Sequence, residues 1–99
     1  MSVEVKNSYE AVVVYSLAAG EESMTAVKDK IQALIAENAE LGDVDEWGKR
    51  RLAYLINDEA EAFYVLYNFV CTGAFPNELE RVCRITDGIL RALVIRKEK

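Results

Sequence analysis

The chain has 99 residues, of which 52% are hydrophobic, and it carries a formal net charge of −5 without a single histidine. Such a chain has room for one folded domain with a modest core, contains no apolar run near the roughly 18 residues of a membrane span, and begins without the features of a signal peptide. The lack of histidine removes the commonest general base and most zinc chemistry. A catalyst that uses only carboxylates or lysine remains possible, but nothing in the sequence points to the paired groups that it needs. We therefore expect a cytoplasmic protein that is not an enzyme, acts on no small-molecule substrate and needs no metal or cofactor.

The first half of the chain predicts a strand, a helix and a second strand. Residues Tyr9–Leu17 are β-branched and aromatic with a continuous apolar centre, which is typical of a central strand. Residues Glu21–Asn38 place apolar side chains along one stripe of an amphipathic helix, with two glutamates in the first turn, where the helix dipole favours negative charge. Residues Val44–Ile56 return to a strand pattern, and Gly48 within them predicts a bulge or bend.

The second half of the chain predicts a hairpin partner, a helix and a last strand. Residues Ala62–Cys71 follow a polar turn, expected at residues 57–61, that is short enough for an antiparallel hairpin with the preceding strand. Pro76 suits the start of a helix that continues to about Ile85. After an Asp-Gly turn, residues Ile89–Arg96 form the final strand.

This β-α-β-β-α-β order predicts an α+β fold of the ferredoxin-like, split β-α-β type, with a four-stranded antiparallel sheet and two helices on one face. We expect one domain over residues 1–99, with a core from about 7 to 97. The other sheet face is then free for solvent, a second subunit, a ligand or nucleic acid, and the fold does not choose between them. Cys71 and Cys83 are expected to be buried hydrophobic residues.

Three consecutive cations, Lys49, Arg50 and Arg51, lie on a predicted strand of this acidic protein. Because neighbours on a strand point to opposite faces, the two arginines cannot serve the same surface. The predicted fold also brings Lys6 and Arg91 to the sheet region of the middle hairpin. Phosphate contacts are one interpretation of the cluster, since a guanidinium matches phosphate oxygens with two hydrogen bonds. The other is internal ion pairing with nearby carboxylates, for which the candidates are Asp45, Glu59 and Glu61.

Aromatic residues of the predicted strands are a second candidate for binding. Strand alternation places some of Tyr9, Trp47, Tyr54 and Tyr64 on the open face. Such rings can stack on nucleobases or pack across strands. The signature of the RNA-recognition motif is absent from the third strand, which lacks its glycine and its leading cation.

The segment WGKRRLAY, residues 47–54, resembles the most specific part of the bacterial small-subunit ribosomal protein six family. Shorter matches follow in the family's order: Tyr9-Glu10, Phe63-Tyr64 with Asn68-Phe69, Leu79-Glu80-Arg81, Arg84-Ile85, and Ile89-Leu90-Arg91. The resemblance spans about residues 6 to 97. Leu55 departs from it, because the family usually has a proline after this segment.

The resemblance implies a non-catalytic protein of the small ribosomal subunit that binds the central domain of 16S ribosomal RNA as a heterodimer with small-subunit ribosomal protein eighteen. Carried over by position, the RNA contacts that it implies are Lys6, Tyr9, Lys49, Arg50, Arg51 and Arg91. Among these it favours Lys49 and Arg51 for contacts with phosphates, and it leaves Arg50 as the arginine that makes internal ion pairs within the protein. Trp47 and Tyr54 are candidates for contact with the partner protein or for packing within the sheet.

The net charge of −5 predicts weak, salt-sensitive RNA binding by the chain alone, which a basic partner protein would strengthen.

One alternative is a ligand-sensing or self-associating ferredoxin-like module that uses the open sheet face. No glycine-rich ligand loop supports that alternative, and it leaves the cationic cluster unexplained. A hydrolase of the acylphosphatase type would need an arginine-bearing phosphate loop after the first strand, whereas residues 16–22 are acidic and contain no arginine.

Overall fold

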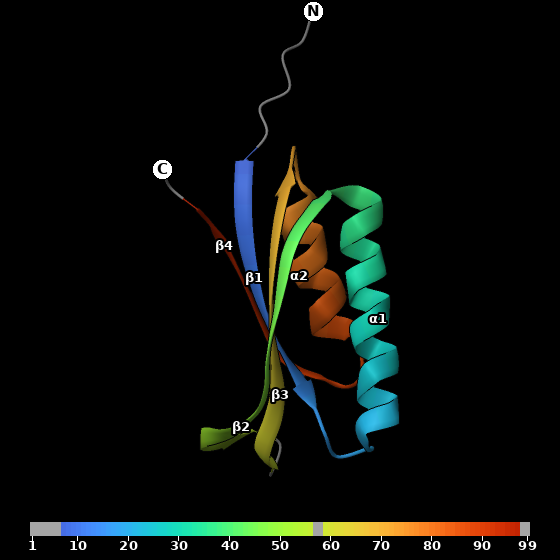
Figure 1. Ribbon diagram of the computed structural model, residues 1–99, viewed down its shortest axis with the longest axis vertical. Coiled ribbons are helices and arrows are strands. Elements are labelled where there is room, and N and C mark those ends of the chain that lie inside the picture. Colours follow the sequence, from blue (N-terminus) through green and yellow to red (C-terminus); the bar gives the residue numbers. More distant parts are fainter. Residues whose placement is uncertain (1–6, 57–58, 98–99) are drawn as a thin grey trace, which may run out of the picture.

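The computed structural model describes residues 7–56 and 59–97, without the side chains of residues 53–56. The elements are β1 (Asn7–Ser16), α1 (Glu21–Asn38), β2 (Glu40–Ile56), β3 (Glu59–Cys71), α2 (Phe75–Ile85) and β4 (Ile89–Arg96). The strands form one antiparallel sheet in the order β2-β3-β1-β4, and both helices lie on the same side of it (Figure 1). This arrangement confirms the predicted split β-α-β fold.

Most element boundaries agree with the sequence prediction, including both ends of α1 and of β4. Pro76 lies in the first turn of α2, as predicted. Proline has no backbone N–H, and the N–H groups of a first turn have no acceptor within the helix, so none is lost. At the lower end of Figure 1, the end of β2 turns away from the helices. Neither helix in the described part of the chain has the length and apolar character needed to cross a membrane.

Both strands of the middle hairpin, β2 and β3, are longer than the sequence predicts. β2 begins at Glu40, because Glu40 pairs with Val70 of β3 even though the segment that follows is polar and contains a glycine. The side-chain amide of Asn68 donates a hydrogen bond of 3.2 Å to the backbone carbonyl of Asp43, where the ladder is irregular. β3 begins at Glu59, so the prediction that residues 59–61 belong to a turn is wrong. Cross-strand pairing therefore outweighs the local preference of these residues.

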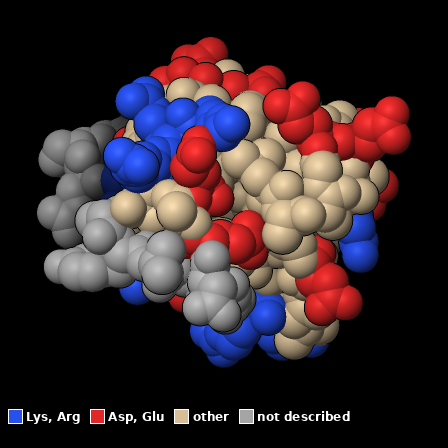
Figure 2. Space-filling view, turned by 90° about the horizontal axis from the view of Figure 1, so that it is seen from below, with Lys and Arg blue, Asp and Glu red and all other residues tan. Residues whose placement is uncertain are grey.

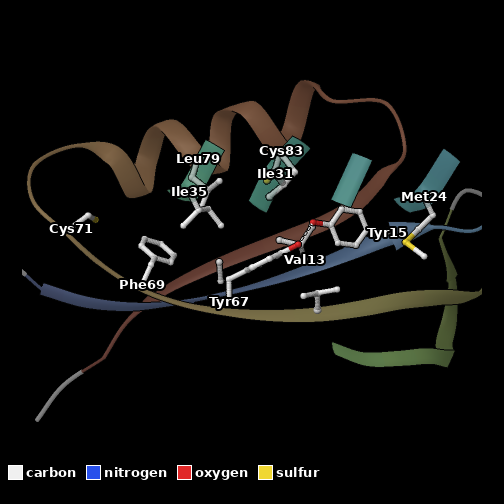
Figure 3. Close-up of a cluster of buried hydrophobic side chains, with 12 residues drawn as sticks. Val13, Tyr15, Met24, Ile31, Ile35, Tyr67, Phe69, Cys71, Leu79 and Cys83 are labelled. Carbon is white, nitrogen blue, oxygen red and sulfur yellow. Dashed lines mark hydrogen bonds between the residues drawn. The ribbon is translucent and has the colours of Figure 1, made fainter. Parts of the chain in front are cut away.

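The core lies between the sheet and the two helices (Figure 3). Alternate residues of the two central strands point toward the helices and are buried. They are Ala11, Val13 and Tyr15 of β1 with Val65, Tyr67, Phe69 and Cys71 of β3. The helices cover them with Ile31 and Ile35 from α1 and Leu79 and Cys83 from α2.

Both cysteines are free thiols inside this core, which confirms the prediction that they are buried hydrophobic residues. Burial raises the pKa of Cys83 to about 11, with a smaller contribution from the nearby carboxylate of Glu80. Burial also raises the pKa of Cys71. The reactive thiolate forms are therefore disfavoured at neutral pH.

Two tyrosine hydroxyls face each other in the middle of this core. Tyr15 of β1 and Tyr67 of β3 are both completely buried, and their hydroxyl oxygens are joined by a hydrogen bond of 2.7 Å (Figure 3). Each hydroxyl thus gives the other the partner that a buried polar group requires. Burial raises the pKa of Tyr67 to about 12 and also raises the pKa of Tyr15.

Removing the second hydroxyl should cost less than removing the first. Tyr67→Phe leaves the buried hydroxyl of Tyr15 without a partner, and we expect the free energy of unfolding to fall by about 1–3 kcal/mol. The double variant Tyr15→Phe/Tyr67→Phe leaves no orphaned hydroxyl and should lose less than the sum of the two single variants. Urea unfolding of the four proteins measures this, and strictly additive losses would contradict the proposed pairing.

The same pair predicts a loss of stability in alkali. Both tyrosines have a raised pKa in the folded protein, so their contribution is complete below the unfolded pKa of about 10 and is lost as the pH rises above it. Each buried tyrosine should contribute a slope of up to about 1.4 kcal/mol per pH unit in that range. Urea unfolding at pH 9, 10 and 11 should show a steeper decline for the native chain than for the double phenylalanine variant. Parallel declines would contradict this assignment.

Candidate nucleic-acid interface

The sheet face opposite the helices is not covered by either helix, and strand register identifies the residues on it. Val14 alternates with the core residues Val13 and Tyr15, so it points away from the helices. Val14 is paired with Tyr64 of β3 on one side and with Arg91 of β4 on the other. Directly paired residues project from the same face, so Tyr64 and Arg91 both lie on this open face.

β2 contributes an exposed aromatic side chain next to Tyr64. Glu46 pairs with Val65 and Gly48 pairs with Tyr64, so Trp47 is an extra residue in a bulge, and Gly48 has a positive φ of 83°. This confirms the bulge that the glycine predicts. The ring of Trp47 stacks on that of Tyr64, with centroids 6.2 Å apart and an interplanar angle of 15°. Its indole Nε1–H donates a hydrogen bond of 3.1 Å to Oδ2 of Asp45, and the residue remains 40% exposed.

Arg50 lies beside this aromatic pair. It is paired with Ala62, which is in phase with Tyr64 along β3, so its side chain leaves the open face. Trp47, Arg50 and Tyr64 together line an open hollow of about 460 Å³. The hollow therefore combines two stacked rings with one guanidinium.

Lys49 and Arg51 leave the opposite side of β2. They are paired with Phe63 and Glu61, which are in phase with the core residues of β3. The predicted division of Arg50 and Arg51 between the two faces is confirmed. All three cations of the cluster are exposed.

The prediction that Arg50 is the structurally engaged cation of this cluster is wrong. In the described part of the chain, neither Arg50 nor Arg51 makes an ion pair with a carboxylate, whereas Lys49 Nζ lies 3.5 Å from Glu61 Oε2. Both members of that pair are more than half exposed, so it contributes less than about 1 kcal/mol. The two guanidiniums are therefore available for other partners.

Some cations elsewhere on the domain have carboxylate partners, whereas Lys30, Arg91 and Arg96 have none among the described residues. Ion pairs join Lys28 to Glu46, Arg81 to Glu78, Arg84 to Glu80, and Lys97 to Glu10. In Figure 2 a group of lysine and arginine side chains borders the grey residues, with acidic side chains next to it, while other basic side chains lie apart at the lower margin. The surface is thus a mixture of both charges.

The remaining residues of the predicted interface are placed differently. Tyr9 lies on the helix side, half-buried at the edge of the core, where its ring stacks on Phe69 with centroids 5.7 Å apart. Arg91 shares a row with Tyr64 but lies on the edge strand farthest from β2, with β1 and β3 between them. Lys6 and the side chain of Tyr54 lie outside the described residues.

Sequence reasoning missed an apolar strip on the open face. Leu93 and Ile95 of β4 are 52% and 49% exposed, and Val12 of β1 joins Leu93 to Leu66 of β3 in one row of this face. The alternation of Arg91, Leu93 and Ile95 along the last strand was the available signal, because it places all three on one face. Among the described residues no group of three or more histidine, cysteine, aspartate or glutamate side chains could hold a metal ion.

Comparisons with known proteins identify similar chains. The family described as Ribosomal protein S6 matches residues 8–96. Small ribosomal subunit protein bS6 of Thermoanaerobacter pseudethanolicus is 45% identical over 93 residues, covering 93% of this chain and 98% of the relative. The protein of the same name from Caldanaerobacter subterraneus is 46% identical over 92 residues, covering 92% and 97%. A crystal structure of 30S ribosomal protein S6 from Thermotoga maritima superposes with a TM-score of 0.86 at 26% identity, covering 94% of this chain and 89% of that one.

The bulge at Gly48 should be sensitive to a side chain. Gly48→Ala places a Cβ in a left-handed conformation, although no atom lies within 4 Å of that position, so the cost should come from the backbone alone and reach about 1–2 kcal/mol. Gly48→Asn should cost less, because asparagine tolerates this conformation better. Urea unfolding measures both changes, and an alanine variant as stable as the native chain would contradict the assigned strain.

Proposed function

The chain belongs to the ribosomal protein S6 family and is a protein of the small ribosomal subunit, and from this premise we propose that it binds the central domain of 16S ribosomal RNA together with small-subunit ribosomal protein eighteen. As a ribosomal subunit protein it is cytoplasmic. Its family consists of structural ribosomal proteins, and we infer that this chain likewise has a non-catalytic role.

The observation that carries RNA binding is the pair of consecutive, exposed arginines on β2. Within the described residues, Arg50 and Arg51 have no carboxylate partner on a domain whose net charge is −5. The two guanidiniums place local positive charge on an acidic domain, whereas Arg81 is bonded to Glu78. Free guanidiniums match phosphate oxygens with two hydrogen bonds each. Arg50 and Arg51 are therefore the strongest phosphate contacts in the proposed set, with Arg91 and Lys49 as further ones.

The proposed protein partner is basic and covers the apolar strip of Leu66, Leu93 and Ile95. Two of these residues are about half exposed, and burying them would supply apolar area to a heterodimer. The net charge of −5 is complementary to a basic partner, which would also supply the positive field that RNA binding needs. Trp47 stacks on Tyr64, which lies next to this strip, so Trp47 remains a candidate for contact with the partner. The side chain of Tyr54, the other candidate, lies outside the described residues.

An RNA-binding assay with and without the partner tests this function. The purified chain is mixed with a central-domain fragment of 16S ribosomal RNA, and complex formation is followed by gel mobility. We expect tight binding only when ribosomal protein eighteen is present. Failure to bind RNA in either case, together with stable self-association of the chain, would instead support a self-associating module that uses the open sheet face.

An arginine substitution locates the phosphate contact. Arg51→Gln should weaken the complex of both proteins with RNA and reduce the slope of log affinity against log salt by about one, because one phosphate contact is lost. Arg81→Gln is the matched control, because Arg81 is an exposed arginine that is already bonded to Glu78 on α2. Equal effects of the two substitutions would show that Arg51 contributes only general charge.

A further inference from the structure

The open hollow beside Trp47 has a chemistry that the family assignment does not explain. One face of the indole is stacked on Tyr64, and the bond from its Nε1–H to Asp45 fixes its orientation. The residue nevertheless remains 40% exposed and forms a wall of the hollow with Arg50. An aromatic pair held in place but incompletely covered offers a flat apolar surface to a further ring.

The charges on this part of the open face favour an anionic ligand. Arg50 lines the hollow, and Arg91 lies in the same row as Tyr64 at a backbone separation of two strand spacings, roughly 10 Å. Neither guanidinium has a carboxylate partner within the described part of the chain. Two carboxylates of this face have partners within the chain, since Asp45 accepts the indole hydrogen bond and Glu10 is paired with Lys97. Asp45 keeps its negative charge, because the indole donor is neutral, so the anionic ligand must be held from the Arg50 side of the hollow.

We propose that Trp47 and Tyr64 form a stacking site for one unpaired nucleobase of RNA, and that Arg50 and Arg91, on opposite edges of the sheet, contact phosphates of the same RNA strand. This inference rests on the proposed RNA-binding function and specifies the part of the RNA that the open face recognises. A base within a duplex has no free face to present, so the site requires a loop, bulge or single-stranded segment. Stacking is tolerant of base identity, because every base has a π-face.

The geometry also revises which cations act together. The family resemblance favoured Lys49 and Arg51 for phosphates, but these leave the helix side of β2, and Lys49 already contacts Glu61. Arg50 and Arg91 share the face that carries the aromatic pair. A nucleotide chain crossing the sheet over Tyr64 can reach both of them, whereas Lys49 and Arg51 would contact a different part of a larger RNA.

Trp47 is the only tryptophan of the chain, so it can report on its own environment. The chain is labelled with 5-fluorotryptophan, and its single fluorine resonance is followed on addition of ribosomal protein eighteen and then of the central-domain RNA fragment. Free adenosine monophosphate is added to the labelled chain in a separate arm. We expect the resonance to shift when the RNA is added, beyond any change that the partner protein causes.

Each other outcome of the labelling experiment overturns the inference. A shift that is complete with the partner protein alone assigns the hollow to that protein. No shift in a complex that gel mobility shows to be formed leaves RNA binding intact but removes the stacking site. A shift with the free nucleotide and none with RNA assigns the site to a small ligand. If no complex forms, the proposed function fails and this inference fails with it.

Substitutions separate stacking from charge. Trp47→Leu should weaken RNA binding by about tenfold, whereas Trp47→Phe, which keeps an aromatic face, should stay within about threefold of the native chain. Arg50→Gln and Arg91→Gln should each lower the salt slope by about one, and Arg84→Gln on α2 should not. The affinity of Trp47→Leu for ribosomal protein eighteen, measured without RNA, shows how much of its loss comes from partner binding and how much from stacking. Equal losses for the leucine and phenylalanine variants would overturn the stacking assignment.

Discussion

The antiparallel pairing of β1 with β3 fixes the arrangement of the rest of the molecule. Their register runs without interruption from Asn7 opposite Cys71 to Ser16 opposite Ala62. Because side chains alternate along a strand, this one register sends Tyr15 and Tyr67 into the core together and leaves Val14 and Tyr64 on the other face. A slip by one residue would exchange the two faces. In this register the two buried tyrosine hydroxyls are joined by a hydrogen bond, so the register satisfies polar as well as apolar groups of the core.

The two faces of the sheet consequently have different roles. The helix side is a packed core in which every described buried side-chain nitrogen or oxygen has a hydrogen-bond partner. The open side keeps apolar and aromatic residues exposed, including Leu93, Ile95 and Trp47. An isolated domain has little physical reason to expose such side chains in neighbouring rows, so their presence is consistent with a protein that functions within a larger assembly.

The charged side chains also differ in whether they have partners within the chain. Several cations, such as Lys28 and Arg81, are joined to carboxylates of the chain, whereas Arg50, Arg51 and Arg91 are not within the described residues. The bulge at Gly48 contributes to this arrangement, because the extra residue brings Trp47 onto Tyr64 on the open face, next to Arg50. In the proposed complex a basic partner protein and an RNA would meet these two kinds of surface, apolar and cationic, on one small acidic domain.

The sequence by itself determined the order and type of the elements, because hydrophobic periodicity, Gly48 and Pro76 act over a few neighbouring residues. It also determined that Arg50 and Arg51 leave opposite faces, since alternation is a local property of a strand. Only the tertiary structure decided that Glu40 and Glu59 join strands, because their pairing depends on residues far along the chain. The same holds for the interface. Whether a cation meets a carboxylate, and which residues lie next to Tyr9 and Tyr64, depend on the register between strands, which no local pattern specifies.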